Sequence, residues 1–217
     1  TVSVFANPGS SDIYNTQSEA GVAAFAVLPK GGGGGETELV VKDVDGLLSA
    51  IGAGKDAVSL AKGEYDLAGV LTVSAPLALK GQDGAVVKGG FKLSGAVGNF
   101  SIENLTVDAA GQGLFIELDA TEGVVAENVT VENTVLTGFG KSVIYASNAA
   151  DKFQIDNIIF NGIEVYEQGT GQGMFDLRNG KYQSFAITNS TLTKGRDFLR
   201  IDATCTLNSV FVMNNTM

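Results

Sequence analysis

The sequence contains no histidine, no tryptophan, three prolines and a single cysteine, Cys205. The absence of histidine excludes a Ser-His-Asp triad, a Cys-His pair and a His-ligated zinc site. One cysteine cannot form an internal disulfide, and we expect Cys205 to be a small core residue. No apolar run approaches the ~20 residues that a membrane-spanning helix needs. Basic residues number 14 against 24 acidic ones, for a net charge of −10, which argues against a nucleic-acid partner.

Glycine and apolar residues are abundant instead. The 217 residues include 29 glycines, and 44% of the chain is hydrophobic. That hydrophobic content argues against disorder, and the glycines indicate many turns between short strands.

The first 37 residues predict a small unit followed by a linker. Residues 1–6 alternate like a strand, residues 7–12 form a turn cluster, and residues 21–28 predict a second strand that Pro29 ends. Five consecutive glycines, 31–35, lie within a predicted flexible linker at 30–37. The chain begins at Thr1 and its last repeat runs to its end, so we expect it to be part of a longer protein, truncated at the C-terminus.

A helix and then strands follow the linker. Asp43 is a good N-cap, and apolar residues at helical spacing predict a helix over 43–51. After this helix the apolar period changes to two, which predicts strands at 57–61, 70–73, 76–79, 85–87 and 91–93.

From residue 100 the chain repeats a five-residue pattern of apolar-x-apolar-x-Asn. The copies end at Asn104, Asn128, Asn157, Asn189 and Asn215, with spacings of 24, 29, 32 and 26 residues. Strand-rich repeats of this length predict an all-β parallel β-helix over 38–217, whose coils stack about 4.8 Å apart. We expect the five asparagines to stack at one bend, and one interior column to contain Phe100, Val124, Phe153, Phe185 and Phe211. The helix at 43–51 should cover the open end of the first coil.

Three stretches resemble known families. The helix followed by residues 57–65 and 77–81 resembles the start of pectate-lyase-like right-handed parallel β-helices. Residues 173–178, 189–191 and 196–200 are similar to secreted β-helix proteins of Bacteroidetes with uncharacterised function, and residues 1–29 resemble the end of a fibronectin type III domain. The resemblance implies a right-handed helix, an extracellular or outer-membrane-attached location, and a glycan-import complex as a partner.

Charge is distributed unevenly along the repeats. No basic residue lies between Lys92 and Lys141, whereas all three arginines fall within residues 178–200. We expect Arg178 to pair in register with Arg200, because this places Leu177 and Leu199 together inside and keeps the guanidinium groups out of the core. The outer face would then present the predicted ligand-binding residues Tyr145, Asp176, Arg178, Arg196, Phe198, Arg200 and Asp202.

Three functions remain open at this point. Guanidinium, carboxylate and aromatic side chains together can bind a polysaccharide, in particular one that contains uronate. The resemblance implies a second function, a lyase in which Arg178 or Arg200 is the base and Ca²⁺, the one cofactor suggested, is held by Asp176, Asp197 and Asp202. A third is a stalk or adhesin module whose charged face is only a set of surface ion pairs. A β-helix glycosidase is disfavoured, because it needs paired aspartates and a histidine.

Overall fold

The computed structural model describes residues 39–109, 111, 114–138, 140–146, 152–166, 173–193, 197–201 and 204–216, together with two N-terminal strands. These strands, β1 (Ser3–Ala6) and β2 (Tyr14–Gln17), pair antiparallel. The predicted strand over 1–6 is therefore present as β1. The predicted strand at 21–28 and the linker at 30–37 lie outside the described residues, and the fibronectin-like assignment stays a prediction.

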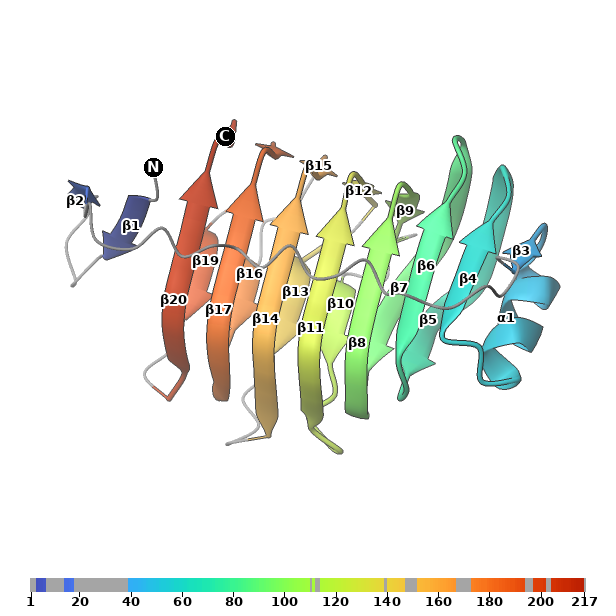
Figure 1. Cartoon of the computed structure of the whole chain (residues 1–217), viewed down its shortest axis with the longest axis horizontal. Helices are drawn as coiled ribbons and strands as arrows, with labels where there is room; N and C mark the ends of the chain where they lie inside the picture. Colours follow the sequence, from blue (N-terminus) through green and yellow to red (C-terminus); the bar gives the residue numbers. More distant parts are fainter. Residues whose placement is uncertain are drawn as a thin grey trace.

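Parallel strands wind into a solenoid with three walls (Figure 1). The first wall is a parallel sheet of β3 (Val40–Val41), β4 (Ala57–Leu60), β6 (Leu77–Gly81), β8 (Gly95–Glu103), β11 (Val124–Glu132), β14 (Phe153–Asn161), β17 (Gly180–Thr188) and β20 (Thr206–Met213). The second wall contains the short strands β9 (Thr106–Asp108), β12 (Val135–Thr137), β15 (Glu164–Val165) and β18 (Thr191–Leu192). The third wall contains β10 (Leu114–Leu118), β13 (Ser142–Ala146), β16 (Gly173–Leu177) and β19 (Asp197–Ile201).

The second and third walls begin as one continuous sheet. In the first coils, β5 (Gly63–Val73) pairs with β7 (Ala85–Leu93), and β7 then pairs with β9 through its first half and with β10 through its second. The strand bends between these halves at Gly89, whose φ is 131° and where a Cβ would lie 2.3 Å from the Gly69 carbonyl oxygen. Only glycine fits so close an approach of two backbones. In later coils separate strands lie on the two sides of this corner, so the second and third walls are distinct there.

Helix α1 (Val44–Gly52) covers the first coil, as predicted (Figure 1). The Asp43 side chain accepts a hydrogen bond of 2.8 Å from the Gly46 N–H, which confirms the predicted N-cap. Leu47 is fully buried, whereas Leu48, which the periodicity also placed on the apolar face, is largely exposed.

The interior is a continuous apolar core. The first and third residues of three predicted repeats, which alternation places inside, are at most 1% exposed: Phe100, Ile102, Phe153, Ile155, Phe185 and Ile187. Cys205 is half-buried and packs against the core at the last coil. The predicted parallel β-helix with a helical cap is therefore confirmed.

The predicted register of the repeat is wrong in part, because each long strand contains two apolar-x-apolar pentads. The interior column that contains Phe100 continues through Val129, Ile158, Phe185 and Val210. Val124 and Phe153 belong to a neighbouring column. Phe211 pairs with Ala186 and so points to the opposite side of the sheet from Phe185.

The asparagines accordingly form two ladders instead of one. The first ladder lies at the end of the first pentad of each strand. In it, Asn128 donates to Asn99 Oδ1 at 2.6 Å, Asn157 donates to Asn128 Oδ1 at 2.9 Å, and Ser184 donates to Asn157 Oδ1 at 2.7 Å. The second ladder lies at the end of the second pentad of each strand, and its residues have φ between 47° and 64°: Asn104, Asn133, Gly162, Asn189 and Asn214. Asparagine and glycine tolerate this left-handed conformation, so the second ladder makes the bend into the second wall.

Candidate functional site on the third wall

The outer face of the third wall carries a row of polar side chains, one from each coil. We call this row the outer ladder, and the strand register orders it as Lys92, Glu117, Tyr145, Asp176 and Arg200. In their own strands the first four lie between buried residues, so strand alternation directs them outward. The ladder runs along the axis of the solenoid with a step of about 4.8 Å between neighbours.

Asp176 and Arg178 form a bidentate ion pair near the middle of this face. The Arg178 Nε donates to Asp176 Oδ1 at 2.7 Å, and Nη2 donates to Oδ2 at 2.6 Å. The Asp176 side chain is 0% exposed and that of Arg178 only 11% exposed. Such charge-assisted fork contacts are among the strongest hydrogen bonds in proteins. Arg178 also lies over the Tyr145 ring, with its guanidinium carbon 5.7 Å from the ring centroid.

Arg200 completes the cluster from the next coil. Its Nη1 lies 4.0 Å from Asp176 Oδ2, and its side chain is 45% exposed. One buried carboxylate therefore faces two guanidinium groups, and the three side chains carry a net charge of +1. The cluster of Tyr145, Asp176, Arg178 and Arg200 is a locally cationic patch on an acidic protein.

The structure corrects three details of the predicted site. Arg200 pairs in register with Asp176 rather than with Arg178, a shift of two residues that leaves all three on one face. Asp176 is buried rather than exposed, because Arg178 folds back over it. Phe198 packs inward against Phe175, with ring centroids 5.5 Å apart. In both β16 and β19 the second and third residues contact the core, so inward and outward side chains alternate only after them.

The remaining predicted residues do not join the cluster within the described structure. Arg196 and Asp202 lie outside the described residues. Asp197 is exposed at the start of β19, opposite Gly173. Among the residues that the structure describes, no three Asp, Glu or Cys side chains converge to hold a metal ion. Asp176 also fits Ca²⁺ poorly, because both of its oxygens accept from Arg178 and Arg200 adds a second positive charge.

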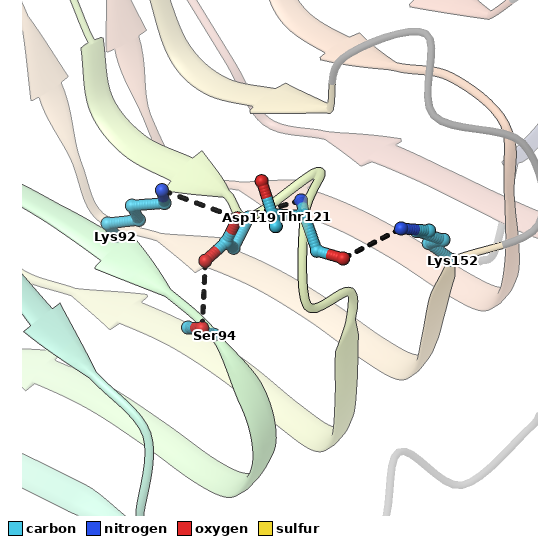
Figure 2. A network of polar contacts seen from close by, with 5 residues as sticks. All are labelled: Lys92, Ser94, Asp119, Thr121 and Lys152. Atoms are coloured by element: carbon cyan, nitrogen blue, oxygen red, sulfur yellow. Dashed lines mark hydrogen bonds and ion pairs between the residues drawn. The ribbon is translucent and has the colours of Figure 1, made fainter.

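A second polar network lies two coils away on the same wall (Figure 2). The Asp119 carboxylate accepts from the Thr121 N–H at 2.9 Å and from the Ser94 hydroxyl at 2.9 Å, and its Oδ1 lies 3.3 Å from Lys92 Nζ. Lys152 donates to the Thr121 carbonyl at 2.7 Å. The pKa of Asp119 lies below its usual range, mainly because of the hydrogen bond from the Thr121 N–H. Ser94 and Lys92 lower this pKa further, whereas burial raises it by less than the Thr121 N–H lowers it. This network fixes the turn between β10 and β11.

Sequence reasoning did not include Lys92 and Glu117 in the predicted site. Both follow the same alternation as Asp176, so a search for charged residues at outward positions of earlier coils could have found them. Glu117 is half-buried and makes no hydrogen bond or ion pair with any described residue.

The structure also shows an open hollow of about 420 Å³ away from this cluster. It lies at the bend between the first and second walls and contains no basic side chain. Its lining residues are Gly81, Asp83, Gly84, Ala85, Asn104, Leu105, Thr106, Asn133 and Val135.

Fold and site together define a parallel β-solenoid with a charged outer ladder on its third wall. Residues 63–195, more than half of the chain, match the family described as "Domain of unknown function (DUF4957)", so the chain belongs to this family. No curated protein and no solved structure matches the sequence. Within the described residues, no helix is long and apolar enough to cross a membrane.

Proposed function

We propose that the protein binds an acidic polysaccharide through Tyr145, Arg178 and Arg200 on the third wall, outside the cell or at its surface, and that it serves glycan capture and uptake. One observation carries this proposal: the buried Asp176 neutralises only one of the two guanidinium groups beside it. Arg200 is the more exposed of the two, so it is available for the carboxylate of a sugar acid. Tyr145 is half-buried one strand from Asp176, with Arg178 over its ring, and its hydroxyl can exchange a hydrogen bond with a sugar hydroxyl.

The geometry gives less support to the lyase alternative. Removing a proton from Arg178 would take the positive charge from both of its hydrogen bonds to Asp176 and leave Arg200, 4.0 Å away, as the countercharge of that buried carboxylate. Arg200 remains the only arginine of the cluster with an exposed guanidinium, and the described carboxylates around it do not form a Ca²⁺ site. A stalk or adhesin module would use the same ion pairs without a ligand.

Binding measurements on one exposed arginine test the proposal. The Arg200→Ala variant should lose about tenfold to a hundredfold in affinity for polygalacturonate, the range expected when one charge-assisted hydrogen bond is removed. Its melting temperature should stay close to that of the wild type, because the Asp176–Arg178 pair remains. Calorimetric titration, with thermal unfolding of both proteins, measures the two quantities.

The control is Lys181→Ala, which removes an exposed positive charge from β17 in the first wall. This variant should bind polygalacturonate as the wild type does. Equal affinity of Arg200→Ala and wild type, or no binding by any of the three, would favour the stalk. Ultraviolet absorbance from unsaturated uronates in the same samples would favour the lyase.

A further inference from the structure

The outer ladder changes the sign of its charge along the solenoid. Asp176 in β16 and Arg178 just after this strand are outward positions. The equivalent positions two strands earlier in the same wall are Glu117 in β10 and Asp119 just after it, also two residues apart. Lys92 pairs with Asp119, so the three charged groups Lys92, Glu117 and Asp119 sum to −1. Asp176, Arg178 and Arg200 sum to +1.

Glu117 supplies the uncompensated charge at the negative end. Its register neighbours are Lys92, which turns to Asp119, and Tyr145, which is uncharged. A half-buried carboxylate without an ion-pair partner can accept hydrogen bonds from hydroxyl groups, and it repels a carboxylate placed beside it. Tyr145, the uncharged member of the cluster, lies between Glu117 and the charged members Asp176, Arg178 and Arg200.

Resting on the proposed function, we infer that the bound polysaccharide lies along the outer ladder with an acidic sugar at Arg200 and a neutral sugar at Glu117. Three strand steps, about 14 Å, separate these two positions. A hexose unit is comparable in length with one step, so a short oligosaccharide spans the ladder and passes over Tyr145. The ligand is therefore an acidic polysaccharide in which neutral sugars are interspersed, rather than a fully charged polyuronate.

Glu117 acts in this arrangement as a specificity residue. Two unit charges about 5 Å apart in water repel by an amount that corresponds to roughly a fourfold loss of affinity. The wild-type protein should therefore bind partly methyl-esterified polygalacturonate more tightly than the fully de-esterified polymer, because an ester removes the charge from the unit beside Glu117.

The experiment compares these two polymers with Glu117→Gln, which keeps the shape and hydrogen-bonding oxygen but removes the charge. This variant should gain about three- to fivefold in affinity for the de-esterified polymer and lose its preference for the esterified one. Glu127→Gln in β11 of the first wall removes one negative charge elsewhere, and it controls for the overall charge of the protein. Its polymer preference should remain that of the wild type.

Three outcomes decide the inference. A gain confined to Glu117→Gln supports it. Equal behaviour of Glu117→Gln and Glu127→Gln, with binding still dependent on Arg200, overturns the inference and leaves the proposed function in place. Binding that does not depend on Arg200, or no binding of either polymer, overturns the proposed function and the inference with it.

Discussion

At the scale of single residues, Asp176 determines how its neighbours can act. It is fully buried, and both of its carboxylate oxygens accept hydrogen bonds from Arg178. A buried carboxylate without its partner is strongly unfavourable, whereas a pair replaced as a whole by apolar residues is often neutral. Arg178 is therefore first a structural partner of Asp176, and Arg200 is the residue left available for a ligand.

We predict that Arg178→Ala lowers the free energy of unfolding by about 1–3 kcal/mol, because it removes both charge-assisted hydrogen bonds to Asp176 and leaves Arg200, 4.0 Å away, as the remaining partner of that carboxylate. The double variant Asp176→Leu with Arg178→Leu should recover most of this loss. Lys80→Ala is the control, since its ion pair with Glu103 is about 40% exposed on both sides and should contribute only about 0–1 kcal/mol. Denaturant unfolding measures all three, and a cost below about 1 kcal/mol for Arg178→Ala would contradict the structural role.

At the scale of elements, the turn between β10 and β11 depends on Asp119. Its pKa is lower in the folded protein than the ordinary value of 3.8, so its charged form stabilises the fold. This contribution is fully present above the ordinary pKa and disappears as the pH falls through the lower, folded value. The β10–β11 turn should therefore be a source of acid sensitivity.

We predict that the stability difference between wild type and Asp119→Asn narrows as the pH falls below 3.8. Asparagine can still accept from the Thr121 N–H, but it cannot pair with Lys92 and does not titrate. Urea unfolding at a series of pH values measures the difference, and Asp83→Asn at an exposed turn controls for the removal of one carboxylate. A difference that is constant from neutral to acid pH would show that the turn does not depend on the charge.

The strands themselves could be predicted from the sequence, but their register could not. Period-two alternation predicted the walls, and Asp43 with its apolar neighbours predicted α1. Each long strand, however, holds two similar pentads, such as residues 124–128 and 129–133, and both of these end in asparagine. If a strand shifted by one pentad, apolar residues would still pair with apolar residues. The sequence pattern therefore fits both registers, and only the three-dimensional pairing distinguishes the two.

The same limit applies to the candidate site. Alternation placed Asp176, Arg178 and Arg200 on one face, and the structure agrees. Burial of Asp176 and the stacking of Arg178 on Tyr145 depend on a coil about 30 residues earlier, which no local pattern identifies. Alternation around an inward Leu199 predicts an outward Phe198, whereas in the structure both residues pack against the core.

At the scale of the whole molecule, the aromatic residues divide the solenoid in two. Phe91 contacts Phe100 and Phe115 in the early coils, with ring centroids 5.4 and 5.9 Å apart. In the late coils Phe175 contacts three other rings at 4.9, 5.2 and 5.5 Å, those of Phe160, Phe185 and Phe198. Among the described residues, those of β11, β12 and β13 that reach the core between the clusters are aliphatic. Because each coil contacts its immediate neighbours, stability should be regional.

We predict that Phe185→Ala, which removes a fully buried ring, costs about 3–5 kcal/mol and acts mainly on the late coils. Native-state hydrogen exchange should show faster exchange for amides of β14, β16, β17 and β20, while β4, β6 and β8 keep their protection. Phe100→Ala should give the opposite profile, since its ring belongs to the early cluster. Uniform acceleration along the chain in both variants would instead mean that the solenoid opens as one cooperative unit.

Regional behaviour would have a functional consequence, because Asp176 and Arg200 lie in the late part and Lys92 and Glu117 in the early part. A ligand that spans the outer ladder would then connect the two regions and should protect the late coils from exchange.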